Sequence, residues 1–219
     1  MSRLMRVTGK GTIRVKPDTV RLLITLEGVE KEYGIALQRA ARDTQVLQKI
    51  LQKLGFEPEE LKTLNLDINP KWDSVYNEVR KNYNRIFLGY DFTHELKLEF
   101  PKDNTLLGKV LSALAFSSIQ PSFQILYTVR NQEAVKNKLL GNAVSDAAKK
   151  ADVLAKAANV KLKEIQTIDY SWGEVKFETD IIARPKAMMD MEEEPRINMD
   201  IEPDDIEKTD TVTVVWEIE

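Results

Sequence analysis

The strongest constraint on the fold of this chain is a pair of glycines inside an alternating stretch near its start. Over Val7–Val15 the odd-numbered positions are apolar or glycine, and the even-numbered positions are threonine, lysine or arginine. Successive side chains of a strand point to opposite faces, so Gly9 and Gly11 lie on the apolar face of a predicted strand. They leave a flat patch that another backbone can approach closely. Pro17 and Asp18 then predict a turn into a second strand, which we expect to pair with the first as a hairpin.

The following segments change between the strand period and the helix period. Residues 19–29 alternate with one apolar face, which predicts a strand. Residues 33–54 repeat apolar side chains at steps of three and four, which predicts a helix that ends at Gly55. Alternation resumes over residues 64–100 around a polar tip at 77–82 and predicts a long β-hairpin. The helix stripe consists of Tyr33, Leu37, Ala40, Thr44, Leu47, Leu51 and Leu54.

Two further helices are expected in the second half of the chain. Asp103 is the predicted N-cap of a short helix and Asn131 that of a long one, because short polar side chains accept hydrogen bonds from the first free amides. Asn159 is expected to end the long helix in the left-handed conformation. The buried stripe of the long helix is rich in alanine, so this helix must lie close to its partner, and the glycine patch is the partner we expect. That stripe consists of Leu140, Ala143, Val144, Ala147, Ala151, Leu154 and Ala158.

The order of these elements indicates the fold class. Strands are also predicted at 123–129, 165–172 and 212–218, and residues 173–208 are expected to be irregular. Helices separated by antiparallel hairpins indicate an α+β fold, with mixed, mainly antiparallel sheets and two long helices and one short helix packed on them. We expect a single domain over residues 1–219, from which the hairpin of residues 64–100 protrudes.

Composition narrows the classes of partner and chemistry. The 219 residues are 42% hydrophobic, include no cysteine and one histidine, and carry a formal net charge of -3. Without cysteine there are no disulfides or thiolate ligands, and one histidine cannot form a histidine-based metal site. The negative charge makes nucleic acid an unlikely partner. No stretch has the length of a secretion signal or of a membrane span, so a cytoplasmic protein is expected.

No catalytic constellation and no cofactor site is evident in the sequence. His94 falls on the apolar face of its strand, which predicts a buried, hydrogen-bonded imidazole. No serine or threonine has an evident base and orienting acid, so a hydrolase triad is not expected. The Gly9-Lys10-Gly11 triplet lies inside a strand, whereas phosphate loops precede a helix and present its free amides to the anion.

Aromatic and basic residues gather toward the outer part of the predicted hairpin. Such a combination can grip single-stranded nucleic acid, pack across strands, or contact another subunit. Cross-strand packing and a subunit or partner contact are favoured over nucleic acid. The cluster consists of Trp72, Tyr76, Tyr83, Phe87 and Tyr90, interleaved with Lys71, Arg80, Lys81 and Arg85.

The segment 186–208 has the most unusual composition in the chain, because acidic residues dominate it and it contains Met188, Met189, Met191 and Met199. Its acidic spacing lacks the alternating ligands and central glycine of a calcium loop. One interpretation is a mobile, solvated loop. Another is a docking segment that uses flexible methionines as adaptable apolar contacts. We expect an arm that becomes ordered against a partner or a neighbouring subunit.

These motifs, in this order, resemble the SIMPL domain family, formerly a domain of unknown function, which includes bacterial periplasmic immunogenic proteins. The matching pieces are Val7-Thr8-Gly9-Lys10-Gly11, Lys16-Pro17-Asp18-Thr19, Leu88-Gly89-Tyr90, the helix segment 143–151 with Ala147 and Ala151, and the final strand 211–216. The resemblance implies a mixed α/β fold and, in some bacterial members, large ring-like or channel-like assemblies. It implies no catalytic residue. Structural roles are expected for Gly9, Gly11, Pro17, Asp18, Gly89, Ala147 and Ala151. Because members usually begin with a secretion signal, export is the alternative location.

The sequence therefore favours a non-enzymatic, self-associating scaffold or binding protein that forms a homo-oligomer or binds another protein. The predicted interface residues are Trp72, Tyr76, Tyr83 and Phe87 of the hairpin and Met188, Met189, Met191 and Met199 of the acidic segment. The alternative is a small-molecule-binding or enzymatic domain that uses a pocket between the sheet and the hairpin.

Overall fold

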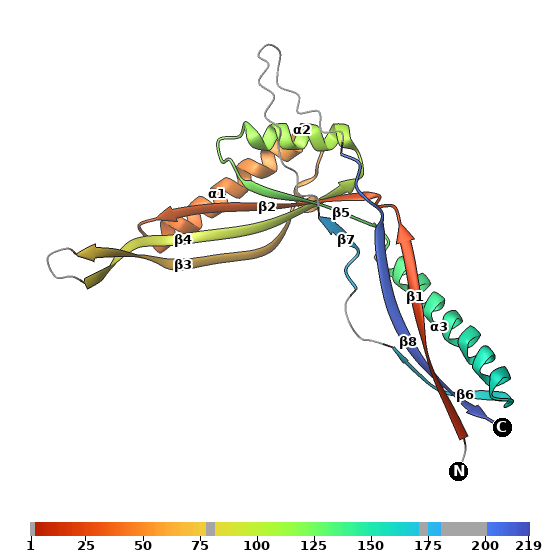
Figure 1. The fold of residues 1–219 in the computed structure, drawn as a ribbon. Coiled ribbons are helices and arrows are strands. Elements are labelled where there is room, and N and C mark those ends of the chain that lie inside the picture. Colours follow the sequence, from red (N-terminus) through yellow and green to blue (C-terminus); the bar gives the residue numbers. More distant parts are fainter. Residues whose placement is uncertain (1–2, 78–81, 171–174, 181–200) are drawn as a thin grey trace. The chain divides into compact units, whose positions relative to one another are not determined.

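The chain forms two compact units, each with its own sheet and core. The computed structural model describes residues 3–77, 82–170, 175–180 and 201–219. Unit 1 comprises Met1–Asp18, Thr128–Thr179 and Pro203–Glu219, and unit 2 comprises Thr19–Tyr127 and Asp180–Glu202. The α+β class with antiparallel strand pairs is confirmed (Figure 1). The expected single domain over residues 1–219 thus contains two compact units, whose boundary no sequence pattern marks.

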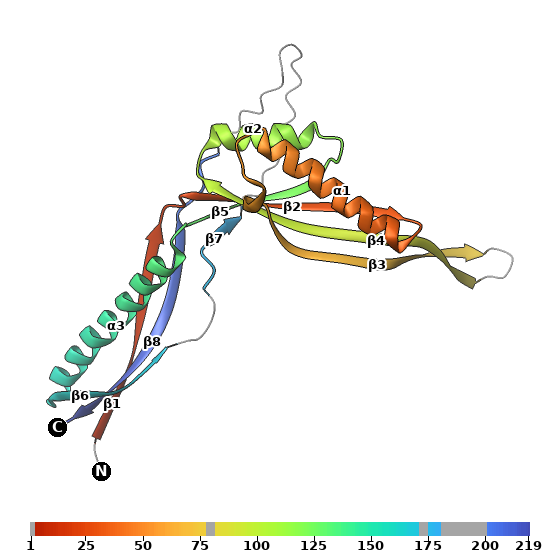
Figure 2. The ribbon, with the colours of Figure 1, turned by 180° about the vertical axis from the view of Figure 1, so that it is seen from behind.

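Unit 1 is a three-stranded sheet with one long helix against it. Its strands are β1 (Arg3–Val15), β8 (Ile206–Ile218) and β6 (Leu162–Tyr170), in the order β1-β8-β6. The register of β1 on β8 runs without a shift from Arg3↔Ile218 to Val15↔Ile206. The helix α3 (Gln132–Ala157) lies along β1 in Figures 1 and 2. The core of this unit therefore lies between α3 and the β1–β8 pair.

The expected hairpin between the first two strands is wrong, because β1 pairs with β8, and β2 (Thr19–Glu30) pairs with β4 of the other sheet. The two strands present different surfaces to different helices. The inner face of β1 has no side chains at Gly9 and Gly11, so a helix can lie very close to it. The inner face of β2 carries large aliphatic side chains such as Leu22 and Ile24. Pro17 and Asp18 do form the connection, and the Asp18 carboxylate accepts a hydrogen bond from the amide of Arg130 at 2.8 Å.

The glycine patch packs directly against α3, as the sequence predicted. A Cβ added to Gly9 would lie 2.7 Å from the Cβ of Ala147 and closer still to the carbonyl oxygen of Ala143. At Gly11 it would lie 2.8 Å from the amide nitrogen of Ala143. The buried stripe differs in part from the predicted one, since Leu154 is 48% exposed. The stripe consists of Leu139, Ala143, Ala147, Ala151 and Ala155.

Unit 2 is a sheet with helices on one face. The strands β3 (Lys62–Asn77), β4 (Asn82–Pro101), β2 and β5 (Ser122–Thr128) follow the order β3-β4-β2-β5. Figure 1 shows α1 (Tyr33–Gln52) and α2 (Asn104–Ala115) on the same face of this sheet. A 3-10 turn, η1 (Pro58–Glu60), links α1 to β3, and the short strand β7 (Glu178–Asp180) spans the boundary of the units in the sequence.

The core of unit 2 is formed by the alternating apolar positions of β2 and β4. Leu22 lies opposite Leu98 and Ile24 opposite Leu96, and all four side chains are buried. Two residues predicted to be buried in α1, Tyr33 and Leu37, are instead 52% and 44% exposed, because the buried stripe at the start of the helix runs through Ala36 and Ala40. On β5, Tyr127 is buried, whereas Phe123 on the same strand is 42% exposed.

The predicted helix ends are confirmed. The Asp103 carboxylate accepts hydrogen bonds from the amides of Thr105 and Leu106, and the Asn131 side chain accepts one from the amide of Ala134. Asn159 has a φ of 52°, the left-handed conformation that ends α3. These signals are local in sequence, so they could be predicted without knowledge of the tertiary structure.

The predicted irregular segment 173–208 is partly strand, since it includes β7 and the first residues of β8. Residues 181–200 lie outside the described ranges. The four methionines of the proposed arm, Met188, Met189, Met191 and Met199, lie there too.

Candidate functional site

The outer half of the β3–β4 hairpin extends beyond the sheet that anchors it. β2 pairs with β4 only as far as Tyr90, so the part of β4 before Tyr90 pairs with β3 alone (Figure 1). Gly89 stands at this exit with a φ of +139°, and an added Cβ would lie 3.0 Å from the carbonyl carbon of Glu30. The pairing of β3 with β4 also shifts between Lys71 and Trp72. The hairpin therefore changes its register where it leaves the sheet.

One face of this extension is aromatic. Trp72 lies opposite Phe87 and Tyr76 opposite Tyr83, with ring centroids 5.0 and 5.2 Å apart. The rings share a face because residues four apart on a strand point the same way. Their exposed fractions are 49% for Trp72, 49% for Tyr76, 71% for Tyr83 and 39% for Phe87. The expected cross-strand packing is thus present, yet much of each ring remains open to solvent.

Arg85 completes this surface. It lies opposite Ser74, between the two ring pairs, and its guanidinium carbon is 5.3 Å from the centroid of the Trp72 ring. This is the distance of a cation–π contact. Among the described residues Arg85 makes no ion pair. We call the surface formed by Trp72, Tyr76, Tyr83, Arg85 and Phe87 the aromatic face.

The row of rings continues toward the base of the hairpin. The ring centroids of Phe87 and Tyr90 are 5.3 Å apart, and those of Tyr90 and Tyr33, at the start of α1, are 5.7 Å apart. Both pairs are in edge-to-face arrangements. Aromatic pairs of this geometry stabilise a structure beyond the area that they bury. The base of the hairpin is therefore held in a defined orientation on α1.

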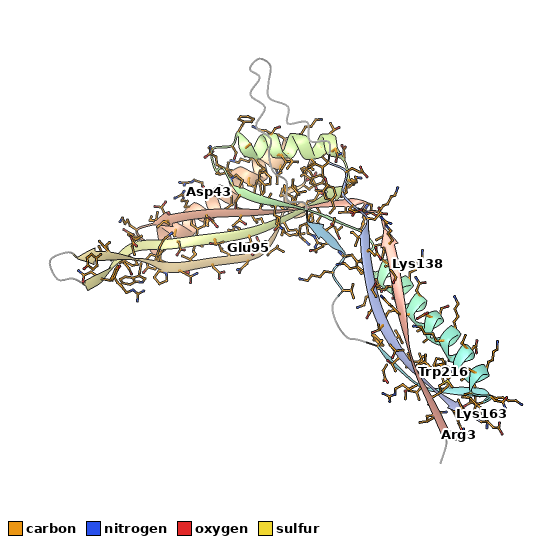
Figure 3. All side chains as sticks on the ribbon, viewed as in Figure 1. Arg3, Asp43, Glu95, Lys138, Lys163 and Trp216 are labelled. Atoms are coloured by element: carbon orange, nitrogen blue, oxygen red, sulfur yellow. The ribbon has the colours of Figure 1, made fainter. Side chains whose placement is uncertain are left out.

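A shallow depression lies on the face of the unit 2 sheet opposite α1 and α2. Its volume is about 270 Å³. Glu95 is the one charged residue that lines it, and Figure 3 shows this side chain on β4 pointing away from the helices. The lining consists of Leu23, Ile24, Thr25, Leu64, Glu95, Leu96, Ser122, Phe123 and Gln124. These residues come from four strands, so the sequence alone does not predict that they meet.

His94 is buried between two threonines. Its Nδ1 lies 2.9 Å from the hydroxyl of Thr44 and its Nε2 lies 3.0 Å from the hydroxyl of Thr63. The Thr44 hydroxyl donates to the carbonyl of Ala40, so it accepts from Nδ1–H, and Nε2 accepts from Thr63. Burial lowers the pKa of His94. The neutral imidazole thus links α1, β3 and β4, and its predicted structural environment is confirmed.

A polar flank of α3 covers the free edge of β1. The amide of Lys10 donates to the Asp146 carboxylate at 2.7 Å, and the Asn142 side chain donates to the carbonyl of Thr12 at 3.0 Å. The Lys10 hydrogen bond and the ammonium of Lys150 lower the pKa of Asp146. Covering an edge in this way prevents the addition of another strand.

Within residues 3–77, 82–170, 175–180 and 201–219, no group of three or more histidine, aspartate or glutamate residues could hold a metal ion. Within the same ranges, none of the helices combines the length and the apolar character needed to cross a bilayer.

With this architecture in view, the sequence defines the class of protein. It matches the SIMPL family, described as a protein of unknown function (DUF541), over residues 5–216. The chain belongs to the SIMPL family. The predicted resemblance is therefore confirmed.

Particular relatives are two 26 kDa periplasmic immunogenic proteins, from Brucella abortus strain S19 and from Brucella melitensis biotype 1. Each is 26% identical to this chain over 166 residues, which cover 74% of this chain and 64% of the relative. The chain thus spans somewhat less than two thirds of the length of these relatives. The regulatory subunit of aspartate kinase from Thermus flavus matches 97% of this chain and 90% of its own with 9% identity. Its TM-score of 0.16 is too low to support an argument from fold.

Proposed function

We propose that this protein is a non-enzymatic scaffold or binding protein that associates with copies of itself through the aromatic face. The observation that carries the proposal is the exposure of four rings on a projecting hairpin, with Tyr83 exposed to 71%. Contiguous apolar surface of this kind marks interaction sites, and Trp, Tyr and Arg are enriched at interfaces. The cross-strand ring contacts support the proposal further, since rigid side chains lose little entropy on binding.

The test is the mass of the purified protein by light scattering across micromolar concentrations. We expect a mass above that of one chain for the wild-type protein. The double variant Trp72→Ser, Tyr83→Ser is expected to shift the mass toward one chain. Phe116→Ser is the matched control, because Phe116 is 68% exposed but lies after α2, outside the aromatic face. A wild-type protein that stays at about 25 kDa throughout would refute self-association.

An exported location is part of the proposal. It is supported by the periplasmic relatives, whereas the expected cytoplasmic location has no support from them. Fractionation of cells that express the natural gene tests it. Recovery of the protein with cytoplasmic markers rather than with periplasmic ones would contradict it.

The alternative, a small-molecule-binding or enzymatic domain, has one supporting feature, the depression beside Glu95. Pockets for drug-sized ligands have volumes of about 300–1,000 Å³, and this depression is smaller, at about 270 Å³. A thermal-shift screen of small organic amines and acids tests the alternative. Saturable stabilisation that Glu95→Gln abolishes would favour it over the scaffold.

A further inference from the structure

The depression and the aromatic face have complementary chemistry, although they lie on the same unit. The depression offers a carboxylate among apolar side chains, of which Leu64 is 52% exposed and Phe123 42% exposed. The aromatic face offers exposed rings and the guanidinium of Arg85, which has no ion-pair partner among the described residues. Arginine is well suited to a carboxylate at an interface, because its planar donors match the two oxygens.

The charge of Glu95 is not neutralised by its neighbours on the sheet. The nearby cations of Arg21 and Lys97 are directed to Glu99, at 2.6 and 3.6 Å. Glu95 itself makes no ion pair or hydrogen bond with any residue in the described ranges. The same face of the sheet therefore carries one compensated carboxylate and one that is available to an incoming cation.

The size of the depression favours a side chain as its occupant. Its volume of about 270 Å³ lies just below the range for drug-sized ligands. An aromatic ring of the hairpin, with the apolar stem of an arginine beside it, is a smaller object than such a ligand. Trp72 and Arg85 already stack on each other in this way.

The hairpin cannot reach the depression of its own copy. Arg85 and Glu95 lie on the same strand, ten residues apart. At about 3.3 Å per residue, the strand separates them by about 33 Å. The occupant must therefore come from another molecule.

We propose that the aromatic face of one copy docks into the depression of a second copy, with Arg85 of the first pairing with Glu95 of the second. This mode of contact rests on the proposed function. The contact is heterologous, because two different surfaces meet, so each copy keeps one unused aromatic face or depression for the next copy. The angle between successive copies then decides whether the assembly closes or continues.

Charge reversal tests the pair. Arg85→Glu and Glu95→Arg are each expected to raise the dissociation constant of self-association at least about tenfold, because a charge truncated or reversed at a buried pair is costly. The double variant Arg85→Glu, Glu95→Arg is expected to recover most of the loss. Glu59→Arg is the control, since Glu59 is exposed on η1, outside the depression. A double variant as weak as the two single changes combined would overturn the pairing.

Mixing two defective proteins tests the head-to-tail mode. One copy carries Trp72→Ser and Tyr83→Ser, and the other carries Glu95→Arg. Each alone is expected to be largely monomeric, whereas the mixture forms a one-to-one complex, because an intact aromatic face then meets an intact depression. No complex in the mixture would refute the inference. If the ring variants dissociate the protein while Glu95→Arg leaves it assembled, the proposed function survives and the inference fails; if wild-type protein is monomeric, both fail.

Discussion

Replacing Gly9 by alanine should destabilise unit 1, although alanine normally stabilises a strand relative to glycine. The added Cβ would lie 2.7 Å from the Cβ of Ala147, whereas ordinary contact begins at 3.4 Å. It would also meet the carbonyl of Ala143 and the amide of Ala147, which are backbone atoms and cannot rotate away. The helix α3 must then move off β1 and loosen the alanine stripe that is buried between them.

The expected change in the free energy of unfolding combines two opposing contributions. Overpacking a filled core costs about 1–3 kcal/mol. Removing the conformational freedom of a glycine from the unfolded chain returns about 0.4–1 kcal/mol. We therefore expect Gly9→Ala to lower the free energy of unfolding by about 1–2 kcal/mol. Gly11→Leu should lower it further, because a Cβ at this position already meets Leu139 and Ala143, and the rest of the leucine side chain needs additional space.

The assay is urea unfolding followed by circular dichroism, with Gly141→Ala as the control. Gly141 lies in α3 with open space around its Cβ position, so the same substitution should stabilise the helix by about 0.5–1 kcal/mol. The two variants are thus expected to change the free energy of unfolding in opposite directions, although the substitution is the same. Equal effects at Gly9 and Gly141 would refute the argument from close packing.

Two further predictions concern titratable groups. Because burial lowers the pKa of His94 in the folded state, the unfolded chain takes up a proton first as the pH falls below about 6.5, so this stability is present above that pH and decreases below it. His94→Gln, which can keep one donor and one acceptor toward Thr44 and Thr63, should flatten the decrease below about pH 6.5 in urea unfolding curves. Parallel pH dependences of wild-type and variant stability would contradict this. Asp146→Ala removes the acceptor of the Lys10 amide, so hydrogen exchange at Lys10 should become faster; an unchanged exchange rate would show that the helix alone protects this edge.

The features that the sequence predicted correctly are those whose physical cause is local or carried by a single surface. Asp103 and Asn131 cap helices because their own side chains reach the next few amides, and Asn159 ends α3 through its own backbone conformation. The contact of the glycine patch with the alanine stripe could also be predicted, since small residues on two surfaces allow only each other to approach so closely. The aromatic cluster could be predicted as well, because its large side chains all lie on one hairpin.

The partners of the strands were decided only by the tertiary structure. Pairing of β1 with β8 joins Arg3 to Ile218, and no local pattern distinguishes this pairing from the expected hairpin with β2. The depression also depends on the long-range pairing of strands, because Glu95 has apolar neighbours only when β2, β3 and β5 lie beside β4 or near it. Alternation along a strand determines which side chains share a face, whereas the neighbours across that face depend on which strands the whole chain can bring together while filling two separate cores.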